Sequence, residues 1–208
     1  MDTLEHFNCF VSTVYVIKKP EFLEPVNTVS ARYLEQSKEF IPDAKITRMT
    51  GSYAHEPELE EFSRYISQTA WNILSSQGYA MDNLVTYFTE MWTQEHNNHS
   101  SMDYHVHGHG AQISAFYFLD TPPEGCQLIV HDPRPAKVIV SLPPKDDRTI
   151  SSASQHIVLT PDAGTLIFAN AWLPHSFSRN NSDTPMRFVH MNLTVLPAPE
   201  QKAEVEVI

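Results

Sequence analysis

Three histidines stand at every second position just before an apolar run: His105, His107 and His109. In a strand, residues i and i+2 point to the same face, so neighbouring imidazoles of this run would lie side by side. A further histidine, His175, follows Trp172-Leu173-Pro174 much later in the chain. Neutral imidazole is the commonest metal ligand and suits iron, zinc, copper and nickel. The pattern therefore predicts a metal site of His105, His107 and His175.

The register of this pair is open from sequence alone. His107 and His109 would also face one way, with Gly108 and Gly110 forming a flexible loop around them. Other histidines lack such a pattern, and isolated surface histidines are common. We interpret four of them in that way: His6, His55, His96 and His99.

Composition limits the classes of function. The chain has 208 residues, of which 41% are hydrophobic and 19% charged, as in a soluble globular protein of one domain. Its net charge is −11 and its pI is near 5.4. Binding along a phosphate backbone requires clustered Lys and Arg. A nucleic-acid partner is therefore not expected.

The cysteines and the N-terminus indicate the compartment. Cys9 and Cys126 are the only cysteines, and two thiols in a chain of this size are more often free than paired. The segment from Met1 to His6 lacks the basic and apolar regions of a signal peptide. No apolar run approaches the roughly 20 residues of a membrane span. We expect a cytoplasmic protein without a membrane partner.

The N-terminal part is expected to contain a strand and two helices. Residues 10–17 are β-branched and aromatic, which is typical of a strand, and residues 22–40 have apolar side chains at roughly helical spacing. The clearest helix begins near Pro57, with acidic residues in its first turn, and ends before Gly78. Its apolar side chains recur at i+3 and i+4, so it should pack against a sheet.

From residue 84 onward, short β-rich segments alternate with turn residues such as Pro161-Asp162-Ala163-Gly164. The expected strands cover residues 84–92, 112–120, 126–131, 156–160, 165–170, 174–179 and 186–196. A mainly β sandwich or jelly roll with N-terminal helices is therefore predicted. We expect a single domain over residues 1–208, with support in 1–83, a jelly-roll core in 84–196 and a tail in 197–208.

The chain resembles the 2-oxoglutarate/Fe(II)-dependent oxygenase superfamily, in particular its "putative 2OG-Fe(II) oxygenase" branch, which is related to prolyl hydroxylases. The order of the blocks carries the resemblance, which covers most of the chain. These blocks are His105-Val106-His107, Ile113-Ser114-Ala115-Phe116-Tyr117-Phe118-Leu119, Val130-His131-Asp132-Pro133-Arg134, Pro161 to Phe168, Trp172-Leu173-Pro174-His175 and Arg187-Phe188-Val189-His190-Met191-Asn192.

The resemblance implies a double-stranded β-helix, a cupin-like jelly roll, that holds Fe(II) with a His-x-Asp/Glu pair and a distal histidine. His105 would be the first ligand and His175 the distal one. This chain departs from the pattern, because His107 stands where the superfamily has a carboxylate. Asp132 is the alternative carboxylate donor, although an Asp at a strand end is commonly a turn residue. The second ligand is thus His107, His109 or Asp132.

The resemblance also implies a site for the co-substrate 2-oxoglutarate. Arg187 would hold its far carboxylate, since a planar guanidinium makes bidentate contacts with carboxylates. Alternation groups Arg187 with Val189 and Met191, and we expect this face to line the barrel. Ser114 or Tyr117 would add a hydroxyl to the same carboxylate.

The predicted function is that of a non-haem iron dioxygenase that hydroxylates an unidentified substrate and converts 2-oxoglutarate and O2 to succinate and CO2. Two alternatives stay open. One is a cupin-like three-His metalloprotein that does not use 2-oxoglutarate, and the other is a non-enzymatic jelly-roll binding module. The primary substrate, and whether the protein is a monomer or a homodimer, cannot be read from the sequence.

Overall fold

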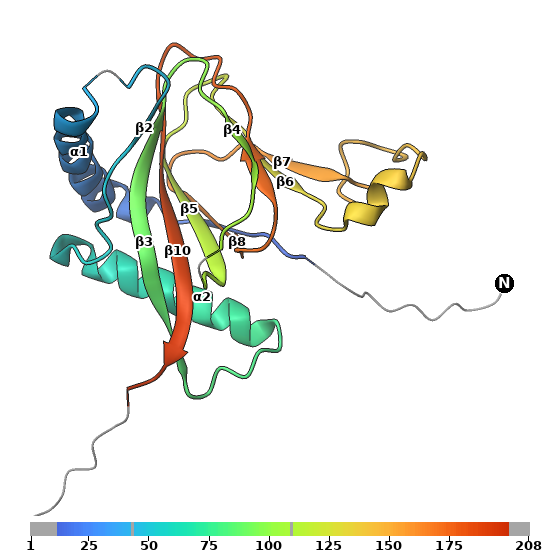
Figure 1. Ribbon diagram of the computed structural model, residues 1–208, viewed down its shortest axis with the longest axis horizontal. Coiled ribbons are helices and arrows are strands. Elements are labelled where there is room, and N and C mark those ends of the chain that lie inside the picture. The colour runs from blue at the N-terminus through green and yellow to red at the C-terminus, as the bar shows by residue number, and fades with distance from the viewer. Residues whose placement is uncertain (1–11, 43, 109, 200–208) are drawn as a thin grey trace, which may run out of the picture.

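Two antiparallel sheets face each other, and two helices cover the outer side of the larger one (Figure 1). The computed structural model describes residues 12–42, 44–108 and 110–199. The larger sheet has the strand order β1-β8-β5-β10-β3-β2, and the smaller sheet has the order β4-β9-β6-β7. The strands are β1 (Tyr15–Lys18), β2 (Thr47–Met49), β3 (Leu84–His96), β4 (Met102–His105), β5 (Ile113–Asp120), β6 (Leu128–His131), β7 (His156–Leu159), β8 (Thr165–Asn170), β9 (His175–Phe177) and β10 (Met186–Pro197).

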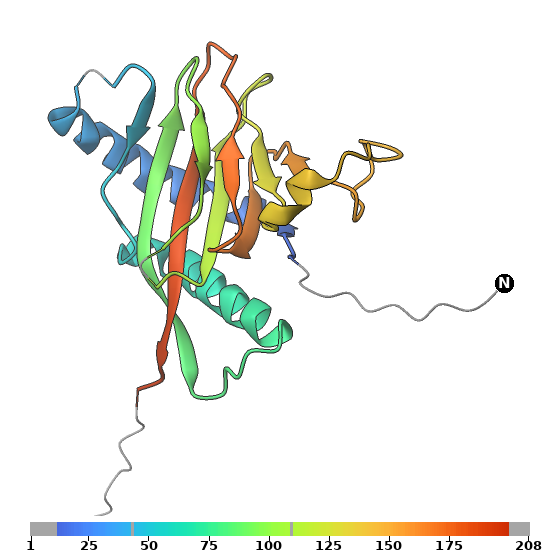
Figure 2. The same ribbon diagram turned by 45° about the vertical axis from the view of Figure 1, so that its right-hand side comes forward.

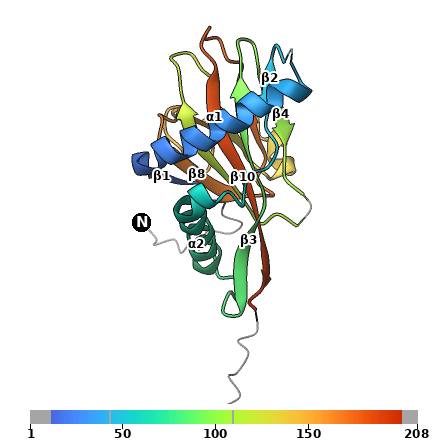
Figure 3. The same ribbon diagram turned by 90° about the vertical axis from the view of Figure 1, so that its left-hand side faces the viewer.

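The two long helices are α1 (Leu23–Phe40) and α2 (Glu60–Ser76), and both lie against the larger sheet (Figure 3). Short 3-10 turns at Pro20–Phe22 and Pro57–Leu59 lead into them. A third 3-10 turn, Pro135–Ile139, and the loop that follows it project from the smaller sheet on the side away from the helices (Figures 1 and 2).

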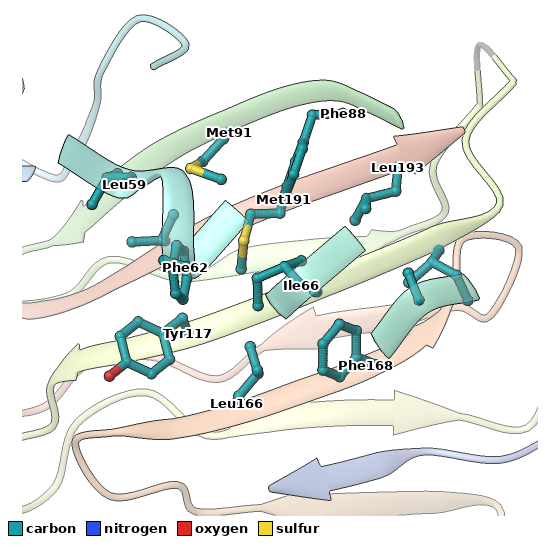
Figure 4. Close-up of a cluster of buried hydrophobic side chains, with 14 of the residues drawn as sticks. Leu59, Phe62, Ile66, Phe88, Met91, Tyr117, Leu166, Phe168, Met191 and Leu193 are labelled. Atoms are coloured by element: carbon teal, nitrogen blue, oxygen red, sulfur yellow. The ribbon is translucent and has the colours of Figure 1, made fainter. Parts of the chain in front are cut away.

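The helix-side core lies between α2 and the larger sheet (Figure 4). Phe62, Ile66 and Ala70 recur on one face of α2 and are fully buried. They pack onto sheet residues that include Met191 and Phe168. Burying one such large apolar side chain contributes roughly 1.5–3 kcal/mol, so this contact fixes the helix on the sheet.

A second apolar cluster fills the space between the two sheets. It includes Phe116 and Phe118 of β5, Phe188 of β10 and Phe177 of β9. Phe177 and Phe188 stack with ring centroids 4.6 Å apart. Alternate side chains of β5 and β10 therefore lie in different cores. Even-numbered residues face the smaller sheet, and odd-numbered residues face the helices.

The predicted fold class is confirmed, and so are the main elements. The helix expected to end before Gly78 is α2, and Gly78 has a φ of +94°, which a glycine adopts without strain. The first strand is shorter than expected, beginning at Tyr15, and residues 10 and 11 lie outside the described part. Of the expected tail, residues 200–208 also lie outside it. No helix among the described residues is long and apolar enough to cross a membrane.

Candidate metal centre

The pairing of β4 with β9 brings the predicted ligands together. His105 lies opposite His175 in the register of these antiparallel strands. His107 follows just after β4, where its backbone N–H donates to the carbonyl of Ala171 at 2.9 Å. One ligand atom of each histidine lies within 4.8 Å of the corresponding atoms of the other two. Residues that are 68 positions apart in sequence thus form one cluster.

The spacing within the cluster suits a metal ion. Nε2 of His107 and Nε2 of His175 are 3.2 Å apart. Two nitrogens bound at about 2.0–2.1 Å from one metal, at an angle of about 90–110°, are separated by about 2.8–3.4 Å. The two imidazoles therefore already stand at the separation of neighbouring ligands.

Backbone carbonyls fix the tautomers of two of the three rings. Nδ1 of His105 donates to the carbonyl of Asp103 at 2.7 Å, and Nδ1 of His175 donates to the carbonyl of Leu173 at 3.0 Å. A carbonyl oxygen only accepts, so each Nδ1 carries the proton and each Nε2 keeps its lone pair. Outer contacts of this kind orient histidine ligands in metalloproteins.

The third ring is held by an amide. Nδ2 of Asn192 lies 3.3 Å from Nδ1 of His107 and donates to it, which leaves the proton of this ring on Nε2. A metal on Nε2 would move that proton to Nδ1, and the amide would then turn its oxygen toward the ring. Ser114 donates to Oδ1 of Asn192 at 2.9 Å, and Nδ2 of Asn192 donates to Glu90 at 3.3 Å. Glu90 thus joins the hydrogen-bond network of His107 through one intervening side chain.

The protonation state of the cluster favours metal binding. Burial lowers the pKa of His107 to about 4 and that of His175 to about 4, with a smaller contribution from neighbouring imidazoles. Both rings are therefore neutral near pH 7. A histidine must be neutral to bind a metal, so no proton has to leave these two rings.

Asp132, the alternative carboxylate donor, is not part of this cluster. Asp132 forms ion pairs with Arg134 at 2.7 Å and Lys137 at 3.0 Å. Hydrogen bonds from Arg134 hold the pKa of the Asp132 carboxyl well below its usual range. His109 lies outside the described residues, as does His6.

The interpretation of His96 as a surface residue is wrong. Its side chain is fully buried between the sheets, where it contacts Gln94 and Ser100. His55 and His99 are exposed, as expected. Cys126 is a buried free thiol, and Cys9 lies outside the described residues.

The residues predicted to hold 2-oxoglutarate are divided between two faces of the larger sheet. Ser114 faces the histidines through Asn192. Tyr117 lies in the helix-side core, and its hydroxyl donates to the carbonyl of Lys19 at 2.7 Å. Arg187 also lies on the helix-facing side.

The grouping of Arg187 with Val189 and Met191 is confirmed, but the expectation that this face lines the barrel is wrong. Val189 and Met191 pack in the helix-side core. Arg187 forms ion pairs with Glu95 of β3 at 2.8 Å and with Asp120 of β5 at 3.2 Å. The opposite face of β10, with Phe188 and His190, points between the sheets.

The sequence interpretation missed the polar residues of that inward face. They are Glu90 and Gln94 on β3 and His190 and Asn192 on β10. A signal was present, because Phe188, His190 and Asn192 share one phase of the alternation and two of them are polar within a buried strand.

Comparisons with known proteins agree with the resemblance. Residues 90–190 match the model of a family described as "Putative 2OG-Fe(II) oxygenase". A search of curated proteins gives no match.

Solved structures share the fold at low sequence identity. An oxidoreductase of the 2OG-Fe(II) oxygenase family from Burkholderia pseudomallei is 11% identical with a TM-score of 0.57, covering 83% of this chain and 77% of that one. A Pseudomonas putida prolyl-4-hydroxylase is 10% identical with a TM-score of 0.57, covering 87% and 91%. HygX from Streptomyces hygroscopicus, solved with nickel, 2-oxoglutarate and hygromycin B, is 12% identical with a TM-score of 0.56, covering 88% and 83%.

Proposed function

We propose that this chain is a 2-oxoglutarate/Fe(II)-dependent hydroxylase whose metal is held by His105, His107 and His175. The family match over residues 90–190, the shared fold and the three-histidine cluster support this proposal. The observation that carries this assignment is the convergence of three imidazoles, two of which have their protons fixed on Nδ1 by backbone carbonyls. With both groups bound, iron and 2-oxoglutarate supply the oxidation, in which O2 and 2-oxoglutarate yield succinate, CO2 and a hydroxylated substrate.

Three neutral ligands would give this centre a distinct charge. A His-x-Asp site contributes one negative charge to the metal, whereas His105, His107 and His175 contribute none. The centre would therefore be one unit more positive than the usual triad, which favours an anionic co-substrate such as 2-oxoglutarate. Glu90, connected to His107 through Asn192, supplies a carboxylate outside the ligand set.

The apolar layer between the sheets would keep water from one side of the centre. Phe116 lies edge-on to His175 with ring centroids 5.2 Å apart, and it also contacts Phe177. Such an environment strengthens the electrostatic interactions of bound ions. The chain's contribution is thus to orient the ligands and to exclude solvent.

We further propose that the partners are 2-oxoglutarate, O2 and an as yet unidentified substrate. A net charge of −11 argues against nucleic acid as that substrate.

One observation favours the alternative of a three-His metalloprotein that does not use 2-oxoglutarate. The strands β3 to β9 contain no Lys or Arg, and the single Arg of β10, Arg187, faces the helices. The strands therefore offer no fixed cation to a dicarboxylate between the sheets.

An anaerobic titration of the purified protein with Fe(II) and then with 2-oxoglutarate separates the two functions. For the hydroxylase, a weak visible charge-transfer band should appear only when both are present, since it reports a keto acid on iron. Iron binding without any effect of 2-oxoglutarate would support the alternative. Absence of iron binding would contradict both functions.

A further inference from the structure

One buried hydrogen-bond donor between the sheets has no partner. His190 is 1% exposed, and its Nε2 makes no hydrogen bond within the described residues. Buried polar atoms in folded proteins are almost always paired, and an unpaired one calls for an explanation such as an absent ligand. His190 therefore offers a donor that an acceptor from outside the chain would satisfy.

A chain of hydrogen bonds places the proton on this nitrogen. Oε1 of Gln94 only accepts, so Nε2 of His96 donates to it at 3.0 Å, and Nδ1 of His96 then accepts from Oγ of Ser100 at 2.9 Å. The amide Nε2 of Gln94 then donates to Nδ1 of His190 at 3.4 Å. Because Nδ1 of a neutral imidazole accepts in this arrangement, Nε2 must carry the N–H.

The position of this donor relates it to the metal centre. The ring of His190 lies 4.5 Å from the ring of His107 and 4.7 Å from that of Phe116, centroid to centroid. On β10, Asn192 contacts His107, and His190 lies two residues before Asn192. Phe188 lies two residues before His190 and is paired with Gln94 of β3. The polar side chains of Asn192, His190 and Gln94 thus form a row between the sheets. The row begins beside the proposed ligand His107 and leads away from the metal.

We propose that His190, oriented by Gln94, donates its Nε2–H to the carboxylate of 2-oxoglutarate that is remote from the keto group. This assignment rests on the proposed function and replaces Arg187, which is engaged with Glu95 and Asp120 on the opposite face. An uncharged donor would take the place of a cation, because strands β3 to β10 carry no Lys or Arg on the faces that point between the sheets.

A cation outside these strands, Arg179, is tested as a competitor. Arg179, in the segment after β9, lines a pocket of about 790 Å³ together with Cys126 and Met186. This pocket lies toward the opposite end of β10 from Asn192, because Met186 begins that strand. An anion bound there would use Arg179 rather than His190.

The test measures the dissociation constant of 2-oxoglutarate on the anaerobic Fe(II) protein from its charge-transfer band. His190→Phe keeps a ring and removes the donor, so 2-oxoglutarate should bind about 10- to 100-fold more weakly, the loss expected for one hydrogen bond to a charged group. His190→Gln restores a donor and should recover most of the affinity. Gln94→Leu, which does not alter the ring beside His107, should also weaken binding.

A second probe, 2-oxobutyrate, identifies the carboxylate involved. It has the keto-acid end of 2-oxoglutarate without the far carboxylate, so its affinity should be unchanged in His190→Phe. An equal loss for both compounds would mean that His190 acts at the metal end, and the proposal would be overturned.

Arg187→Gln and Arg179→Gln serve as matched controls and should bind 2-oxoglutarate as the wild type does. If either variant loses 2-oxoglutarate while His190→Phe and Gln94→Leu keep it, the assignment to His190 fails although the proposed function stands. If the wild-type protein binds iron but shows no charge-transfer band with 2-oxoglutarate, both the proposed function and the assignment to His190 are wrong.

Discussion

His105 on β4 faces His175 on β9 in the register of the smaller sheet, and their ring centroids are 4.4 Å apart. The two residues come from distant parts of the sequence, so their separation is set by backbone pairing rather than by a flexible loop. Each ring is also fixed by a carbonyl two residues before it, that of Asp103 or Leu173. The cluster is thus organised by the sheet itself, which is the condition for ligands that are in place before the metal arrives.

Removal of a proposed ligand should abolish tight metal binding. We expect His175→Ala to weaken Fe(II) binding by more than the roughly 10- to 100-fold that loss of an outer-shell partner costs. Metal content after anaerobic gel filtration measures this. His156→Ala is the matched control, because His156 is exposed on β7 and lies outside the cluster. Equal iron retention in the two variants would contradict the three-His centre.

The contact of Asn192 with His107 should tune metal affinity without supplying a ligand. Asn192→Ala leaves Nδ1 of His107 without its side-chain partner, and we expect Fe(II) binding to weaken by about 10- to 100-fold. Competition with a chromophoric chelator gives the dissociation constant. Asn192→Asp, which offers an acceptor to the Nδ1–H that a metal on Nε2 would leave on His107, should retain more affinity than Asn192→Ala. The same affinity in wild type and Asn192→Ala would rule out this orienting role.

The packing of α2 on the larger sheet should contribute stability independently of the metal. Phe62→Ala removes a side chain that is 1% exposed, and we expect the free energy of unfolding to fall by about 3–5 kcal/mol. Phe40→Ala makes the same chemical change at a position that is 83% exposed and should alter stability by less than about 0.5 kcal/mol. Urea unfolding in the presence of a chelator compares the two. Similar losses would contradict the assignment of α2 to the core.

The sequence was sufficient for the fold class and for the cluster of His105, His107 and His175, but not for the face of β10 that lines the site. Alternation correctly grouped Arg187 with Val189 and Met191. It could not tell which layer they face, because both sides of β10 are buried, one by helices and one by the smaller sheet. A strand that is buried on both faces has no polar side to serve as a reference.

The burial of His96 escaped notice for a related reason. It stands among polar residues at the end of β3 and precedes a loop, which is typical of a surface position. In the structure, that strand end is enclosed by β10 and by the rings of Phe177 and Phe188. These are contacts between distant segments, and local composition does not report them.

His96 should make stability depend on pH below neutrality. Burial lowers its pKa to about 4, whereas the unfolded chain has the ordinary value near 6.5. Between these values the unfolded state binds more protons than the folded state, so the free energy of unfolding falls as the pH falls. The stabilisation is fully present above pH ~6.5 and is lost progressively toward pH ~4. From pH 7 to pH 5 the loss due to this one residue is roughly 1–2 kcal/mol.

Denaturant unfolding at pH 7 and pH 5, with chelator present throughout, measures this loss. Since buried His107, His175 and His190 also have lowered pKa values, the wild-type loss should exceed that of His96 alone. His96→Gln keeps an amide that can contact Gln94 and removes one titrating group, so its stability should fall less between the two pH values than that of the wild type. His55→Gln, at an exposed histidine, should keep the full wild-type dependence. If His96→Gln and the wild type lose the same free energy, His96 does not titrate in this range, and its burial as a neutral imidazole would not explain the acid sensitivity of the fold.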